Sequence, residues 1–178
     1  ADGVSLFVGD SREITAWLSG GVLVTDPPYG MSYSSGWDAR PTANDESTDT
    51  RDAVLGMWGD RPGLVFGRWD CPAPAGARMA LTWDKGDWPG TGDLALPWGP
   101  STENVYVLGT GFEGKRSGSV VRVDRLVGSL AHPNEKPVAL LEILIRKCPA
   151  HLTIADPFAG SGTTRVAARN LGRKAIGV

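Results

Sequence analysis

The sequence has few residues of the kinds that bind metals or form disulfides. Among its 178 residues there are two cysteines, Cys71 and Cys148, and two histidines, His132 and His151. The cysteines lie far apart and lack the C-x-x-C spacing of zinc sites. We therefore expect packing cysteines and no metal site.

Long apolar segments and an excess of positive charge are also missing. No apolar run approaches the roughly 20 residues of a membrane-spanning helix, and no signal-peptide pattern is visible, which favours a cytoplasmic protein without a membrane partner. The 18 Lys and Arg residues are balanced by 20 Asp and Glu residues. Any affinity for nucleic acid would therefore come from local patches. The length fits one domain with a substantial core.

Strand-like and helix-like segments alternate along the chain. The pattern predicts strands at residues 4–10, 22–25, 63–69, 78–86, 103–111, 152–156 and 174–178, and helices at 11–20, 50–60, 136–148 and 163–173. This order is typical of an α/β domain with a single doubly wound, mostly parallel sheet. Ligands of such sheets bind outside the carboxyl ends of the strands, and Asp10, Asp26 and Asp156 follow three of the predicted strands.

The first unusual segment is VLVTDPPYG at residues 22–30, where a buried strand ends in an acid, two prolines and an aromatic residue. Pro27 and Pro28 supply no backbone donors and keep the chain out of helical geometry. The result is a stiff turn whose carbonyl groups are left free. A structural turn with Tyr29 packed against it is the alternative to a functional site.

The second is IADPFAGSGTTR at residues 154–165, a strand followed by a glycine-rich turn and a helix start. Gly160 and Gly162 allow close approach of a ligand, and the helix start offers free N–H groups. A phosphate loop would need a lysine after Gly162, and the dinucleotide pattern would need a small residue in place of Arg165. Neither pattern fits, and an ordinary tight turn remains the alternative.

Taken in order, DPPYG (26–30), HPNEKP (132–137) and DPFAGSGTT (156–164) resemble the amino-methyltransferases of DNA, in the circularly permuted β group. The segments GD (9–10), WDKG (83–86), ENVYVLG (103–109) and LGRKAIGV (171–178) add to the resemblance. It implies a Rossmann-like methyltransferase fold with an antiparallel strand near one edge, and a catalytic domain over residues 1–178. Protein-glutamine methyltransferases are similar but carry NPPY after the cofactor motif.

The resemblance implies transfer of a methyl group from S-adenosylmethionine to an exocyclic amine in DNA. N6 of adenine is favoured over N4 of cytosine, because DPPY is the commoner form for adenine. The amine lone pair is delocalised into the ring, so acceptors for its hydrogens, on Asp26 and the Pro27 carbonyl, would make it more nucleophilic. Pro28 would help to fix the turn, and Tyr29 would stack on the flipped base.

The cofactor would lie along the glycine-rich turn, with Asp10 near its adenine ring and Lys136 near its methionine carboxylate. For Lys136, a solvated lysine at a helix start is the alternative. The residues that the resemblance assigns to cofactor binding are Asp10, Asp26, His132, Asn134, Lys136, Asp156, Phe158, Ala159, Gly160, Ser161, Gly162 and Thr163.

A short target-recognition insert is expected at about residues 110–131, where the family places this region. Within it Lys115, Arg116, Arg122 and Arg125 could form a hairpin that follows DNA phosphates, although so small a cluster is usually only a solvated loop. So short an insert suggests limited sequence recognition or the help of a second subunit, as in a homodimer.

Two functions stay open at this point: a DNA amino-methyltransferase, and a non-catalytic nucleic-acid or protein-binding relative of the same fold. The intact DPPY and glycine-rich segments favour the enzyme. The family has an acid directly after the strand that corresponds to residues 174–178, and its carboxylate binds the cofactor ribose. Because the sequence printed here stops at Val178, we expect this chain to bind the cofactor weakly.

Overall fold

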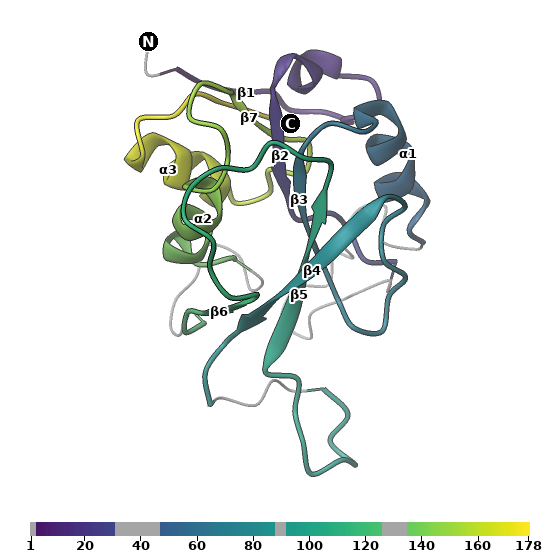
Figure 1. The fold of residues 1–178 in the computed structure, drawn as a ribbon. Helices are drawn as coiled ribbons and strands as arrows, with labels where there is room; N and C mark the ends of the chain where they lie inside the picture. Colours follow the sequence, from purple (N-terminus) through teal and green to yellow (C-terminus); the bar gives the residue numbers. More distant parts are fainter. Residues whose placement is uncertain (1–2, 31–46, 88–91, 126–134) are drawn as a thin grey trace.

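The computed structural model describes residues 3–30, 47–87, 92–125 and 135–178, and eight strands form one sheet through them (Figure 1). Their order in the sheet is β1-β8-β7-β2-β3-β5-β4-β6. The strands are β1 (Val4–Leu6), β2 (Val22–Thr25), β3 (Gly63–Gly67), β4 (Ala77–Asp84), β5 (Thr102–Leu108), β6 (Val120–Arg122), β7 (Ile154–Asp156) and β8 (Ala175–Gly177).

Only β5 among these strands runs against the others. It pairs antiparallel with both β3 and β4, whereas β1, β8, β7, β2 and β3 are joined by parallel pairings, as are β4 and β6. The mostly parallel sheet and the antiparallel strand near one edge are therefore confirmed. Because β5 is reversed, its first residues lie at the same edge as the last residues of its neighbours.

Helices cover both faces of the sheet, as Figure 1 shows for α2 (Val138–Ile145) and α3 (Thr163–Asn170) against α1 (Asp49–Trp58). Residues of β2 alternate between the two layers: Val22 and Val24 belong to the core with α2 and α3, and Leu23 to the core with α1. A strand buried on both faces has no polar side to show, which explains the continuous apolar run at 22–24.

The order of connections reverses between β7 and β2. From β7 the chain passes through α3 to β8 on one side, and from β2 it passes through α1 to β3 on the other. The carboxyl ends of β7 and β2 therefore flank the topological switch point, where open α/β sheets bind ligands.

The predicted helix at 11–20 was wrong in length and type. The segment at 11–20 forms a short 3-10 helix, η1 (Thr15–Ser19), without a side-chain cap from Ser11. Ser11 is instead buried, and its carbonyl accepts a hydrogen bond from the indole of Trp17 at 2.8 Å. The segment of the expected basic hairpin contains β6, which pairs parallel with β4, and residues 126–131 of that segment lie outside the described ranges.

The described residues contain no helix long and apolar enough to cross a membrane. Within the same ranges, no group of three or more His, Cys, Asp or Glu side chains is placed to hold a metal ion. Cys71 and Cys148 are both free thiols, and Cys148 is buried in the core.

Candidate active site at the switch point

The turn after β2 places Asp26 at the carboxyl edge of the sheet. Its carboxylate accepts a hydrogen bond from the Tyr29 hydroxyl at 2.5 Å through Oδ1. Burial, and next the Asp26 charge, raise the pKa of Tyr29 well above its usual range, so this hydroxyl keeps its proton. Within the described chain no hydrogen bond reaches the Pro27 carbonyl, which leaves that acceptor available. Tyr29 is thus tied to Asp26, in addition to any role as a stacking surface.

Lys136 lies beside Asp26, directly before α2. Its ammonium is 2.8 Å from Asp26 Oδ2 and 3.1 Å from Glu103 Oε2, and only 6% of the residue is exposed. Burial lowers its pKa, but the carboxylates of Asp26 and Glu103 outweigh that effect and raise it. A solvated helix-start lysine is therefore excluded.

Glu103 and Lys85 complete this cluster, and sequence reasoning assigned them no role. The Lys85 ammonium is 2.6 Å from Glu103 Oε1, and Glu103 Oε2 faces Lys136. Burial raises the pKa of Glu103, while Lys136 and Lys85 lower it to a greater extent. The available signal was their position at the ends of predicted strands: Lys85 lies near the end of 78–86 and Glu103 at the start of 103–111.

The glycine-rich turn lies next to this cluster, across the switch point. Gly160 and Gly162 adopt positive φ values of 45° and 82°, and Gly162 is the N-cap of α3. A Cβ atom on Gly160 would meet only the Phe158 carbonyl at 3.9 Å, so the space beside that backbone is open. Ser161 at the tip is exposed, whereas Thr163 is buried.

Asp156 faces inward from β7. Its Oδ1 accepts hydrogen bonds from the Thr25 hydroxyl at 2.7 Å and from the Phe158 backbone at 3.3 Å. Burial raises its pKa to about 6, against the opposing effect of these bonds. The Asp156 side chain therefore links β7 to β2 and helps to fix the backbone of the glycine-rich turn at Phe158. The Ala159 N–H is bonded to the Val178 carbonyl at 2.9 Å, which fixes the turn against β8.

Of the remaining cofactor residues from the sequence, only Asp10 is described by the structure, and its side chain contacts Arg12. Asp10 follows β1 by four residues, and Arg12 engages both of its carboxylate oxygens at 2.5–3.1 Å. The hydrogen bond from the Arg12 side chain is the main cause of a pKa of about 2 for Asp10. His132 and Asn134 fall outside the described residues, as does the segment 31–46.

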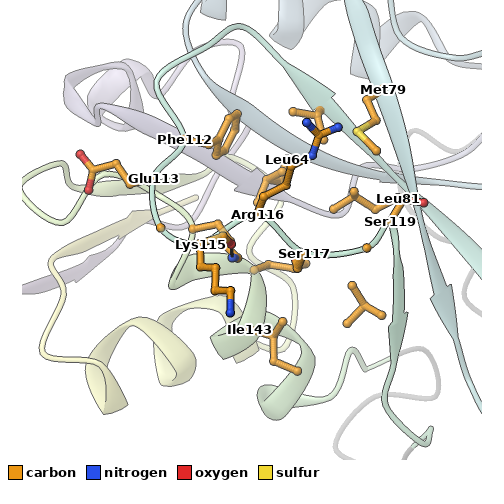
Figure 2. A pocket seen from close by; sticks show the side chains of 16 residues that line it. Leu64, Met79, Leu81, Phe112, Glu113, Lys115, Arg116, Ser117, Ser119 and Ile143 are labelled. Carbon is orange, nitrogen blue, oxygen red and sulfur yellow. Dashed lines mark hydrogen bonds between the residues drawn. The ribbon is translucent and has the colours of Figure 1, made fainter.

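The four basic residues predicted to contact DNA do not form one surface. Lys115 and Arg116 line a groove of about 580 Å³ together with Met79 near the start of β4, as Figure 2 shows. Arg122 lies at the other end of β4, where it is paired with Asp84 at 2.7 Å. Arg125 follows on that side, its backbone N–H bonded to the Lys85 carbonyl. Only Arg122 and Arg125 lie toward the edge that holds Asp26.

The groove in Figure 2 has an apolar floor and lies on the α2 side of the sheet. Its walls include Leu64 of β3, Leu81 of β4 and Ile143 of α2. Leu64 lies near the start of β3, Leu81 in the middle of β4 and Ile143 in the later part of α2, and none of the described lining residues belongs to β2 or β7, so the groove is separate from the switch point.

Fold and site together define a class: an α/β protein with an acid and a glycine-rich turn on either side of its switch point. A family model described as DNA methylase, of the N6/N4 methyltransferase type, matches residues 83–178, which are 96 of the 178 residues. The chain therefore belongs to this DNA methylase family. The matched span includes the glycine-rich turn and Lys136 but not residues 26–30.

Curated relatives match over shorter segments. Type II methyltransferase M.ScaI of Streptomyces caespitosus is 36% identical over 83 residues, which are 46% of this chain and 25% of that protein. Type II methyltransferase M2.DpnII of Streptococcus pneumoniae is 45% identical over 58 residues, 32% of this chain and 21% of that protein. The matched segments thus make up a quarter or less of these relatives.

Solved structures support the fold over nearly the whole chain. The crystal structure of M1.HpyAVI superposes with a TM-score of 0.67 at 18% identity, over 98% of this chain and 90% of that one. The PvuII DNA methyltransferase, described as cytosine-N4-specific, superposes with a TM-score of 0.73 at 16% identity, over 98% of this chain and 80% of that one. At these identities the similarity concerns the fold.

Proposed function

We propose that this chain transfers a methyl group from S-adenosylmethionine to the exocyclic amine of a base in DNA, with N6 of adenine favoured. The observation that carries the proposal is the position of Asp26. In a member of the DNA methylase family, its carboxylate stands at the switch point, across from an open glycine-rich turn.

The arrangement around Asp26 suits activation of an amine. A carboxylate offers about four acceptor positions, and Tyr29 and Lys136 take one on each oxygen. The remaining positions, with the Pro27 carbonyl, can accept both hydrogens of an exocyclic amine. Such preorganised acceptors stabilise the positive charge that develops on nitrogen during the transfer.

The residues around the glycine-rich turn fit a nucleoside cofactor. Gly160 leaves open space beside the backbone, and the start of α3 offers N–H groups, so Phe158, Ala159, Gly160, Ser161, Gly162 and Thr163 would hold it. S-adenosylmethionine supplies an activated methyl group on a sulfonium. We keep His132 and Asn134 as proposed contacts of its methionine end, and Asp10 as a proposed neighbour of its adenine.

The order of the motifs supports the circularly permuted arrangement. The strand before Asp26 is second in the chain and the strand before the glycine-rich turn is seventh, yet the two are neighbours in the sheet. We further propose that residues 1–178 form the catalytic domain, with a short recognition insert at about 110–131, acting on DNA in the cytoplasm. A homodimer would supply further DNA contacts.

The test is a direct assay for both products. Unmethylated genomic DNA is incubated with the chain and S-adenosylmethionine that carries a deuterated methyl group, then digested to nucleosides. Mass spectrometry with authentic standards should show labelled N6-methyladenine; labelled N4-methylcytosine would reassign the base. If neither nucleoside is labelled while the chain is folded and binds both DNA and cofactor, the proposal fails and a non-catalytic relative is the better description.

A further inference from the structure

Four charged side chains form a continuous row behind the DPPYG turn. Lys85 contacts Glu103 at 2.6 Å, Glu103 contacts Lys136 at 3.1 Å, and Lys136 contacts Asp26 at 2.8 Å. They come from the end of β4, the start of β5, the residue before Pro137 and the end of β2. The charges alternate in sign, so the row is neutral as a whole.

Burial increases along the row toward its centre. The side chain of Asp26 is 31% exposed, whereas those of Glu103 and Lys136 are 15% and 7% exposed. An ammonium group this deep is costly unless acids surround it. Asp26 alone, at the edge of solvent, would have to share its charge between Lys136 and a substrate amine. Glu103 supplies the second negative charge that keeps Lys136 in place.

The contact between Glu103 and Lys136 is an ion pair. Glu103 Oε2 is buried and has no hydrogen-bond partner among the described residues, although the Lys136 ammonium is 3.1 Å away. Lys136 meets Asp26 Oδ2 as a second ion pair at 2.8 Å and donates a hydrogen bond to the Tyr29 hydroxyl at 3.4 Å. The charge of Glu103 thus helps to hold the Lys136 ammonium beside Asp26.

We propose that Glu103 is a positioning residue for Asp26, and that it acts through the buried ammonium of Lys136. This inference rests on the proposed methyl transfer. It also gives Lys136 a role that differs from pairing with the methionine carboxylate of the cofactor. The two roles predict different kinetics, because a positioning defect lowers kcat whereas a lost cofactor contact raises the KM for S-adenosylmethionine.

The experiment compares Glu103→Gln, Lys136→Met and the double variant with the unchanged chain. Methyl transfer is measured in single turnover at saturating cofactor and DNA, and cofactor affinity by titration calorimetry. We expect Glu103→Gln to lower the transfer rate by at least about tenfold and to leave the cofactor dissociation constant within about threefold. When Lys136→Met is already present, Glu103→Gln should lower the transfer rate by less than about a further twofold.

Control variants separate positioning from general damage. Glu142→Gln makes the same chemical change on the surface of α2, where an amide oxygen can still accept the bond from Asn170, so its rate should be unchanged. Glu103→Asp keeps the charge and should recover part of the rate. If Glu103→Gln fails to fold, Lys85→Met, which removes the other partner of Glu103, should show a smaller loss of the same kind.

Several results would overturn the inference while the proposed function stands. They are full activity of Glu103→Gln, independent effects of the two changes in the double variant, or an effect confined to cofactor affinity. An unchanged chain that methylates neither adenine nor cytosine would overturn both proposals.

Discussion

Asp26 combines two requirements that a carboxylate rarely meets together. It is exposed enough to receive a substrate, yet Tyr29 and Lys136 fix both of its oxygens within 2.8 Å. Fixed orientation matters because an acceptor that must reorganise during the reaction loses much of its electrostatic effect. The surrounding residues should therefore matter to the rate as well as to stability.

At this scale the first prediction is that Asp26→Ala abolishes methyl transfer. Loss of one preorganised hydrogen-bonding group at a reacting centre commonly costs about 100-fold or more in rate. Cofactor affinity should stay within about threefold, since the carboxylate acts mainly on the amine. Asp52→Ala, at an exposed acid of α1, is the control. Near-normal turnover of Asp26→Ala, measured by product mass spectrometry, would contradict the mechanism.

Asp156 gives a pH-dependent prediction. Its pKa of about 6 in the folded chain lies above the ordinary 3.8, so the folded state holds the proton more tightly than the unfolded state. Its contribution to stability is therefore fully present below pH 4 and is lost as the pH rises through 6. The free energy of unfolding should therefore fall by up to about 3 kcal/mol between pH 4 and 6 because of this carboxyl, and Asp156→Asn should abolish that decrease.

The measurement for Asp156 is urea unfolding of both proteins at several values between pH 4 and 7.5. The difference between the unfolding free energies should change in favour of the asparagine variant as the pH rises. Curves that stay parallel across the range would show that the Asp156 carboxylate titrates normally.

At the scale of elements, the reversed β5 decides which charges meet. Its register pairs Glu103 with Trp83 of β4, beyond the end of β3. A parallel strand in that place would have put Glu103 at the opposite edge. Lys136 joins this edge because it lies immediately before the helix α2, whose later residues extend toward the groove in Figure 2.

The start of α3 provides a prediction on glycine. Gly162→Ala should destabilise the chain by about 1–2 kcal/mol, because φ is 82°, in the left-handed region, and the Arg165 guanidinium would have to move away from the new Cβ. Cofactor affinity should fall as the turn shifts. Gly56→Ala, in the interior of α1 with open space around it, should instead stabilise by up to about 1 kcal/mol. Denaturant unfolding and cofactor titration check both variants. Equal changes in stability and in cofactor affinity would contradict the role of Gly162 in the turn.

At the scale of the whole molecule, the sheet separates the basic residues into two pairs. Arg122 and Arg125 lie toward the edge that holds Asp26, and Lys115 and Arg116 line the groove near the start of β4. A duplex that delivers a base to Asp26 must approach the first pair. Replacing Arg122 and Arg125 by glutamine should reduce the log-log salt slope of DNA binding by about 1 per residue that contacts phosphate.

The matched experiment replaces Lys115 and Arg116 by glutamine, which should leave the salt slope unchanged. Binding is measured by fluorescence anisotropy over a series of salt concentrations. If only the replacement of Lys115 and Arg116 reduces the salt slope, the DNA contacts the other end of the sheet and this prediction is wrong.

Much of the fold was predictable because it depends on local pattern. The apolar run at 22–24 was correctly predicted to be a strand, and the glycine-rich segment at 157–162 was correctly placed after a strand end. The prediction was less reliable at 11–20, where Ser11 and Trp17 are buried and the segment forms a short 3-10 helix in place of the longer predicted helix. The strand β6 was missed because its three residues pair only with a distant strand.

The sequence by itself determined most of the order of strands and helices, the acid after β2 and the glycine-rich turn after β7, since these depend on residues that are neighbours in the chain. The tertiary structure decided which charges meet. Glu103, Lys136 and Asp26 are separated by tens of residues, and they come together because of the reversal of β5 and the start of α2. Charge pairing of this kind depends on distance in space, about which local sequence carries little information.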